Sequence, residues 1–198
     1  HDDYRALVTA VGRFQANAAL TNALNRRMEF TLADAAGVVE ASVARFQDQY
    51  PQLAALDSPL AWLVQDPAAQ ATLLAAAQAL GRASAPTFSA KGSELEQAVS
   101  AGNWAGVVDA LFTQAGSPRK FGEKIVGIHL VRSAQDQVLA VQSANIQHEA
   151  WLHQQRMARL TRLLIGEFSA LKRERGWIDM NDVERGAQRL LSDPVSSG

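Results

Sequence analysis

The feature that most constrains the fold is a long stretch, residues 133–175, that contains no proline and repeats apolar residues with helical spacing. Within it an apolar stripe steps by three and four residues, through Met157, Leu160, Leu164, Phe168 and Leu171. A single helix is predicted here. We expect it to end at Gly176, because glycine readily adopts the left-handed conformation that closes helices.

The rest of the chain also favours helices, and we predict an all-α fold, an irregular multi-helix bundle. Apolar residues follow helical spacing from Tyr4 to Leu20. Residues 124–132 contain β-branched side chains and fit a strand or a helix. Predicted helix starts are a cap at Thr31, the pairs Ser58-Pro59 and Asp66-Pro67, a capping box of Ser93 and Glu96, and a cap at Asn103.

Two stretches rich in turn-forming residues organise the chain. Residues 81–92 form the first predicted loop, a hinge or a boundary between lobes 1–82 and 93–198 of a single helical domain, 1–198. Residues 115–122 form the second loop, which is also basic. His1 in place of methionine and the Ser-Ser-Gly end are expected of an excised fragment.

Composition describes an ordinary globular protein: 198 residues, 47% apolar and 20% charged. The absence of cysteine excludes disulfides and thiolate metal sites. No apolar run could span a bilayer and no signal peptide opens the chain, so a cytoplasmic location is expected. Residues 1–115 carry seven Lys/Arg and eleven Asp/Glu, whereas residues 116–198 carry twelve and nine. A polyanion would therefore meet the C-terminal half.

Motifs for catalysis are missing. The chain has neither a phosphate-binding P-loop nor a dinucleotide-binding glycine motif, and Pro118 makes the segment 116–122 a plain turn. His148 and His153 are five residues apart, which does not suit a helical zinc site. Asp179 and Asp182 are interpreted as a helix cap and a first-turn acid. We expect no catalytic residue, metal or cofactor in this chain.

Basic residues carry the functional signal, because nucleic-acid grooves combine cations for phosphates with aromatic rings for bases. The aromatic residues Phe121, Trp151, Phe168 and Trp177 lie between them in sequence, and Phe168 is expected in the core. Solvated helix faces with core aromatics would give the same pattern, and this alternative stays open. The basic residues form three clusters: Arg119, Lys120 and Lys124; Arg156, Arg159 and Arg162; and Lys172, Arg173 and Arg175.

One segment carries a resemblance to a known family. Phe168, Lys172, Gly176, Ile178-Asp179, Asp182-Val183 and Leu190-Leu191 resemble the Tyr, Lys, Gly, Leu/Ile-Asp, Asp-Leu and Leu-Leu positions near the end of the 1B subdomain in superfamily 1A DNA helicases of the UvrD/RecB/AddA-like family. Residues 111–120 are similar to a second loop of these proteins, and Arg26 to Phe30 to an early 1B region. The chain departs from the pattern at Phe168, Met180 and Val183, where the family has Tyr, Phe and Leu.

The resemblance implies a helical 1B accessory subdomain of a helicase or helicase–nuclease, similar to the exonuclease V beta subunit. It implies that the loop of Pro118, Arg119 and Lys120 and the helix end at Lys172–Arg175 face single-stranded or forked DNA. Ile178–Asp182 would lead back to the motor, and ATP and magnesium would be bound by the parent enzyme alone. Expected partners are DNA, the remainder of the motor and a partner subunit, without a membrane. The alternatives are a helical protein–protein interaction module and a self-contained enzyme.

Overall fold

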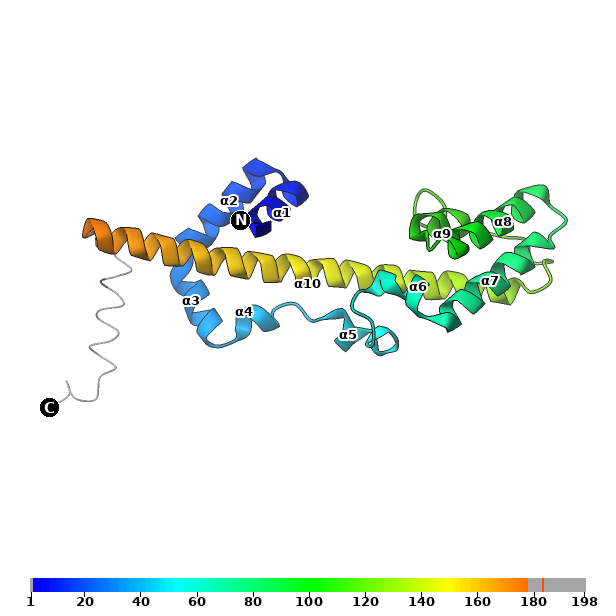
Figure 1. Ribbon diagram of the computed structural model, residues 1–198, viewed down its shortest axis with the longest axis horizontal. Coiled ribbons are helices and arrows are strands. Elements are labelled where there is room, and N and C mark those ends of the chain that lie inside the picture. Colours follow the sequence, from blue (N-terminus) through cyan, green and yellow to red (C-terminus); the bar gives the residue numbers. More distant parts are fainter. Residues whose placement is uncertain (1, 178–182, 184–198) are drawn as a thin grey trace. The chain divides into compact units, whose positions relative to one another are not determined.

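The computed structural model describes residues 2–177 and 183, and over these residues it is all-α, as predicted. The only β pairing in the described part is an isolated bridge between Phe112 and Pro118. The α-helices and two 3-10 helices (η) are, in order, α1 Asp2–Val11, α2 Arg13–Asn25, α3 Arg27–Ala35, α4 Val38–Ala41, α5 Phe46–Gln49, η1 Pro51–Leu53, η2 Pro59–Ala61, α6 Trp62–Gln65, α7 Pro67–Gly81, α8 Pro86–Ser100, α9 Trp104–Leu111 and α10 Ile128–Arg175 (Figure 1).

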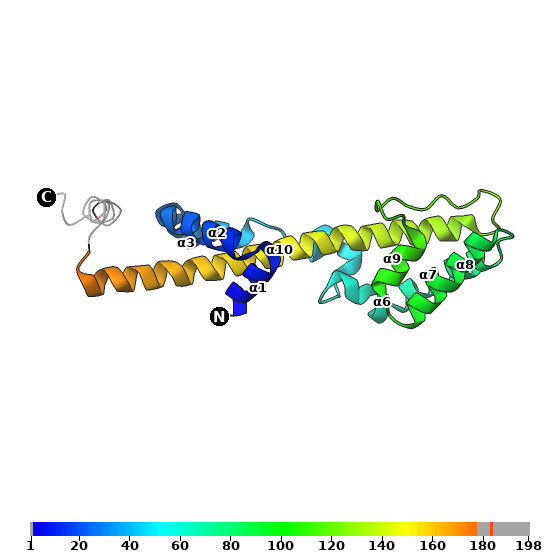
Figure 2. The ribbon, with the colours of Figure 1, turned by 90° about the horizontal axis from the view of Figure 1, so that it is seen from above.

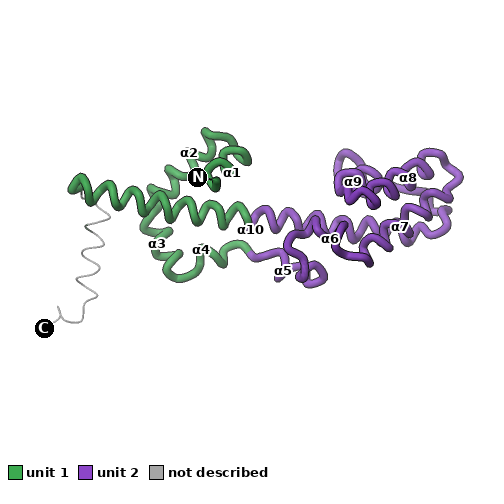
Figure 3. The backbone as a smooth tube through the Cα atoms, in the orientation of Figure 1, with its two compact units in different colours: residues 1–43, 152–198 green, residues 44–151 purple. Residues whose placement is uncertain are grey.

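The chain forms two compact units, which divide at residues 43/44 and 151/152 (Figure 3). Unit 1 contains residues 1–43 and 152–198, and unit 2 contains residues 44–151. The long helix α10 contributes its first half to unit 2 and its second half to unit 1. The expected lobes 1–82 and 93–198 do not coincide with these units, because residues 81–92 lie inside unit 2.

Unit 2 holds the main hydrophobic core. Helices α6 to α9 pack around the first half of α10 (Figures 1 and 2), which supplies Val131, Val138 and Val141 to the core. Two tryptophans meet edge to face, Trp62 and Trp104, with ring centroids 6.5 Å apart. All buried members of this core lie between Phe46 and Ala144.

Two of the predicted caps are confirmed in unit 2. The Asp66 carboxylate accepts hydrogen bonds from the amides of Ala68 and Ala69 at 2.9 and 3.3 Å, and Pro67 occupies the first helical position of α7. The Asn103 side chain accepts from the Gly106 amide at 3.2 Å and starts α9. The predicted helix at Ser58-Pro59 is also present, as η2 and α6.

Two predicted helix starts are wrong. Thr31 lies inside α3, where its hydroxyl donates to the Arg27 carbonyl at 2.7 Å instead of capping a helix. The helix expected after it is broken at Gly37, which has φ 72°. Ser93 and Glu96 lie inside α8, which starts at Pro86, because proline fits the first turn and precedes the capping box.

The segment 81–92 is mostly helix because α7 and α8 make an unusually close contact. Gly92 is buried, and a Cβ atom built on it would lie 2.6 Å from the Gly81 amide nitrogen and 2.7 Å from the Ala77 carbonyl oxygen. Only a residue without a side chain allows the two backbones to approach so closely. The glycines that suggested a flexible boundary therefore join two packed helices.

Unit 1 has a much smaller core. Helices α1 and α2 pack on the second half of α10 through Leu7, Ala16 and Leu160. The predicted apolar stripe of α10 is covered only in part: Leu160 is buried, Met157, Leu164 and Phe168 are half-buried, and Leu171 is exposed.

The predicted helix end at Gly176 is confirmed. Gly176 has φ 64°. Its amide donates a hydrogen bond to the Arg173 carbonyl at 3.3 Å, and the Trp177 amide donates to the Lys172 carbonyl at 2.9 Å. These two bonds are those of a Schellman motif. The start of α10 at Ile128, after turns at 123–127, resolves the choice between strand and helix for residues 124–132 in favour of turn and helix. The interpretations of Asp179 and Asp182 fall outside the described residues.

Replacing Gly92 by alanine is expected to destabilise the protein by about 1–3 kcal/mol, since the new methyl group meets backbone atoms that cannot move independently. Chemical denaturation followed by circular dichroism measures this change. Gly81→Ala is the matched control, because a Cβ atom at Gly81 meets nothing within 4 Å. An equal loss of stability in both variants would contradict the close helix contact.

Residues 44–151 are expected to fold without the rest of the chain, because every buried residue of the main core lies within them. A fragment of these residues should unfold cooperatively on heating and keep dispersed side-chain signals in NMR spectra. A fragment with helical circular dichroism but neither property would show that the unit depends on its flanking segments.

Candidate nucleic-acid interface

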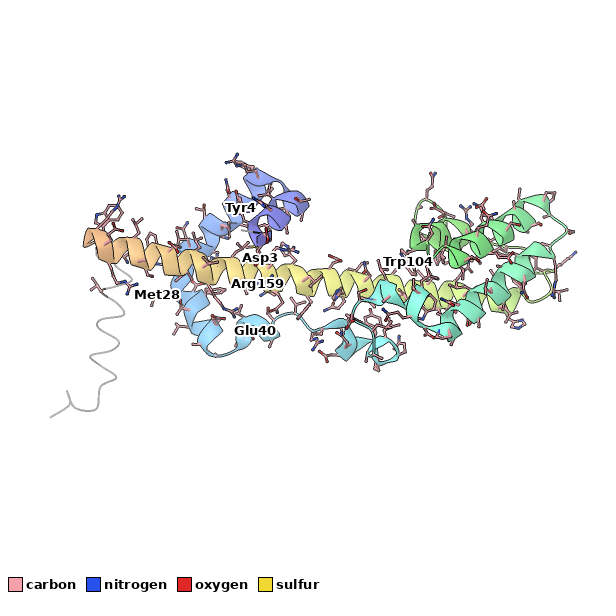
Figure 4. The ribbon with its side chains drawn as sticks, viewed as in Figure 1. Asp3, Tyr4, Met28, Glu40, Trp104 and Arg159 are labelled. Atoms are coloured by element: carbon pink, nitrogen blue, oxygen red, sulfur yellow. The ribbon has the colours of Figure 1, made fainter. Side chains whose placement is uncertain are left out.

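The three basic clusters differ in their surroundings, and the middle one is used internally in unit 1. The Arg159 guanidinium donates two hydrogen bonds to the Asp3 carboxylate, at 2.6 and 2.8 Å (Figure 4). Arg162 makes the same two-bond contact with Asp34, at 2.6 and 2.9 Å, and a third bond to Glu40 at 3.1 Å. Such paired geometry is the strong form of an arginine–carboxylate contact.

These contacts change the proton affinity of the paired groups. The hydrogen bonds from Arg159 hold the pKa of Asp3 below its usual value, and those from Arg162 do the same for the pKa of Asp34. Conversely, the carboxylates raise the pKa of both guanidinium groups. Arg156 is half-buried and adds a weaker favourable charge interaction with Asp3. Arg159 and Arg162 therefore join the N-terminal helices to α10, a different role from the exposed DNA-facing one expected of their cluster.

The cluster at the end of α10 is only partly exposed. Lys172 was expected to face DNA, but it is 7% exposed and its ammonium group lies 5.4 Å from the centre of the Phe168 ring. Arg27 lies over the same ring at 5.0 Å. Phe168 is half-buried beneath these two cations and, contrary to the prediction from the sequence, does not lie deep in the core.

Beyond Lys172 the helix end does present cations. Arg173 and Arg175 are exposed, and the Arg175 guanidinium lies 5.0 Å from the ring centre of Trp177, which is 54% exposed. An exposed arginine stacked on an exposed indole is a combination that can contact a phosphate and a base together.

The first cluster lies in unit 2 on a basic loop, residues 112–124, between α9 and α10. Lys120 and Lys124 are exposed and Arg119 is half-exposed. In the described part of the chain none of the three forms an ion pair with a carboxylate. The Arg119 side chain is oriented by a bond from Nε to the Asp109 carbonyl, at 3.2 Å.

Arg119 and Lys120 border a groove of about 640 Å³. Its apolar side is formed by Phe121 and Ile128. Phe121 is buried and packs edge to face against Phe88, with ring centres 5.5 Å apart. Arg132 adds a further cation, ion-paired with Glu123. The full lining is Ser117, Pro118, Arg119, Lys120, Phe121, Glu123, Ile128, Arg132 and Gln135. Sequence reasoning missed Arg132 and Gln135, whose place opposite the loop follows only from the packing of α10.

His148, one of the two histidines considered for a zinc site, is packed among aromatic side chains of unit 2. The centre of the His148 ring lies 5.1 Å from that of Phe46 and 6.1 Å from that of Trp151. The Arg45 guanidinium lies over the Trp151 ring, 5.7 Å from its centre. Within residues 2–177 no three His, Cys, Asp or Glu side chains gather to hold a metal ion. The described helices include none that is long and apolar enough to cross a membrane.

Unit 1 has a separate apolar groove of about 300 Å³ between α1, α2 and the second half of α10. Its polar neighbour Tyr4 donates its hydroxyl to Asn17 at 2.8 Å and so needs no other partner. The lining is Tyr4, Leu20, Leu160, Leu163, Leu164 and Glu167.

Compared with known protein families, with curated proteins and with solved structures, the chain gives no match.

Acid is expected to weaken unit 1 through its two arginine–aspartate contacts. Because folding lowers the pKa of Asp3 and Asp34, their contribution is complete above the unfolded value of about 3.9 and is lost as the pH falls through the lower folded value. Thermal unfolding between about pH 6 and pH 2 should show Asp34→Asn less stable than wild type at the upper end, with the two converging at the lower end.

The control for this series is Asp57→Asn, which removes an exposed aspartate that has no ion pair among the described residues. Its difference from wild type should not follow the same pH course. Equal behaviour of the two variants would show that the contact between Arg162 and Asp34 does not contribute to stability.

Proposed function

We propose that this chain is a DNA-binding accessory subdomain, similar to the 1B subdomain, of an ATP-dependent DNA helicase or helicase–nuclease. The observation that carries the proposal is the basic loop: the segment that resembles the family's loop places Arg119 and Lys120 beside a groove, with no carboxylate neutralising them in the described structure. The all-helical fold agrees with the proposal.

The chemistry of the loop suits the sugar–phosphate backbone of DNA. Exposed lysine and arginine displace counterions from phosphates, a contribution that does not depend on base sequence. The Phe121 side chain anchors the loop by packing on Phe88, and it is too buried to stack on a base. The exposed Arg175 and Trp177 form a second place where a single strand could be contacted.

The motor functions belong to the parent enzyme in this proposal. The chain contains no P-loop, so ATP and magnesium would be bound by other parts of that enzyme. The accessory subdomain would hold DNA while the motor moves, and alone it would not hydrolyse ATP.

A second candidate function is a helical protein–protein interaction module. It is favoured by the apolar groove of unit 1 and by Phe14, which is 82% exposed on the neighbouring helix α2. Sedimentation distinguishes the DNA-binding subdomain from the interaction module. A particle size that rises with protein concentration and does not change with salt or DNA would favour the interaction module.

Removing the two loop cations is expected to weaken DNA binding. In Arg119→Ala/Lys120→Ala, the affinity for labelled single-stranded and forked DNA at low salt should fall about tenfold or more, and the slope of log affinity against log salt should fall by about two. Fluorescence anisotropy over a salt series measures both.

The charge-matched control is Arg5→Ala/Arg13→Ala, which removes two exposed cations from unit 1. It should reduce binding only slightly, through the net charge. If both double variants bind equally well, the basic loop is not the DNA-binding element; if the wild type does not bind at low salt, the isolated chain lacks the proposed function.

A further inference from the structure

We propose that Gln135 is the positioning residue of the basic loop: its single side-chain amide bonds the backbone at Leu111 and at Arg119 and so holds Arg119 and Lys120 at the groove. The effect on DNA binding rests on the proposed function, whereas the positioning of the loop does not.

Gln135 projects from the first half of α10 and is 6% exposed. Its amide nitrogen Nε2 donates to the Leu111 carbonyl at 2.9 Å and to the Arg119 carbonyl at 3.0 Å. Leu111 is the last residue of α9, where the chain enters the loop, and Arg119 is where it returns. The Arg119 amide also donates to the Leu111 carbonyl, at 2.9 Å, so the two points held by Gln135 are joined to each other as well.

The part of the loop beyond this junction has no core to support it. Every residue from Thr113 to Pro118 is exposed. Its shape depends on hydrogen bonds: the Thr113 amide donates to the Ser117 carbonyl at 2.8 Å, and the Ser117 amide donates to the Thr113 hydroxyl at 3.2 Å. The conformation of this exposed segment therefore depends on how firmly its two ends are held.

The chemistry of the position selects glutamine. A neutral primary amide offers two donors on one nitrogen, and both are used here. Lysine or arginine would bring a charge into a buried place, and glutamate would offer only acceptors to two carbonyl oxygens. Asparagine is one methylene shorter. Losing the donors would leave the partly buried Arg119 carbonyl without this partner, at a cost larger than that of an ordinary surface hydrogen bond.

A loop held in advance loses less conformational freedom when it binds. In this proposal Gln135 acts through the backbone at Arg119, and the Arg119 side chain is then oriented by its own bond to the Asp109 carbonyl.

The test uses the full chain with Gln135→Met, which keeps the bulk of the side chain and removes both donors. The matched control is Gln137→Met on the same helix. Gln137 is half-buried, and its side chain makes no hydrogen bond to the loop in the described structure. Hydrogen exchange of the Thr113, Ser117 and Arg119 amides should become faster by on the order of tenfold in Gln135→Met and stay unchanged in the control.

A second variant, Gln135→Glu, separates hydrogen bonding from packing. Burial raises the pKa of the introduced carboxyl group, and only its protonated form can donate to a carbonyl. The exchange of the same amides, corrected for the intrinsic effect of pH, should slow again between about pH 8 and pH 5 in this variant alone. A role in packing alone would give no such recovery.

The two hypotheses fail in different ways. Faster loop exchange with about tenfold weaker DNA binding in Gln135→Met supports both. Faster exchange in a protein whose wild type binds no DNA supports the positioning role and overturns the proposed function. Unchanged loop exchange in a folded Gln135→Met variant overturns the positioning role, whatever happens to DNA binding.

Discussion

The structure depends on the burial of α10 along both of its halves. The first half supplies Val131, Val138 and Val141 to the main core, and the second half supplies Leu160 to the small core of unit 1. Each set of shorter helices packs on its own half of α10, and in unit 2 the helices α7, α8 and α9 also pack on one another. Helix α10 therefore contributes to both cores, one through each of its halves.

The two units use different physical means on that surface. Unit 2 is held by close apolar packing, including a glycine contact between α7 and α8 and paired aromatic rings. Unit 1 has few buried apolar residues and adds two arginine–aspartate contacts, Arg159 with Asp3 and Arg162 with Asp34. Exposed ion pairs contribute little singly, so the two-bond geometry matters more than their number.

Much of the fold could be predicted because its signals are local. The long helix, its glycine end, and the caps at Asp66 and Asn103 each depend on residues within one or two helical turns. The failures depend on distant residues. Gly92 indicated a loop in the sequence, whereas in the structure it allows α7 and α8 to pack closely. Arg159 and Arg162 were predicted to be available for DNA because their carboxylate partners lie more than 120 residues away in sequence.

The same limit applies to the candidate site. Arg119 and Lys120 could be proposed from the sequence, since a basic, turn-rich loop is recognisable locally. The burial of Lys172 over Phe168 could not be predicted from the sequence, because it depends on packing around the helix end. Gln135 has no signal at all in the sequence: a glutamine on a long helix is ordinary until α9 and the loop meet it.

The division of the chain between the units has a consequence for biosynthesis. Unit 2 is one continuous segment, so its core is complete once residue 151 has left the ribosome. Unit 1 is made of the two segments that flank unit 2. Helices α1 to α4 are synthesised before unit 2, whereas Arg159 and Arg162, which pair with Asp3 and Asp34, are synthesised after it. The helices that precede unit 2 therefore reach these partners only after the whole of unit 2 has been made.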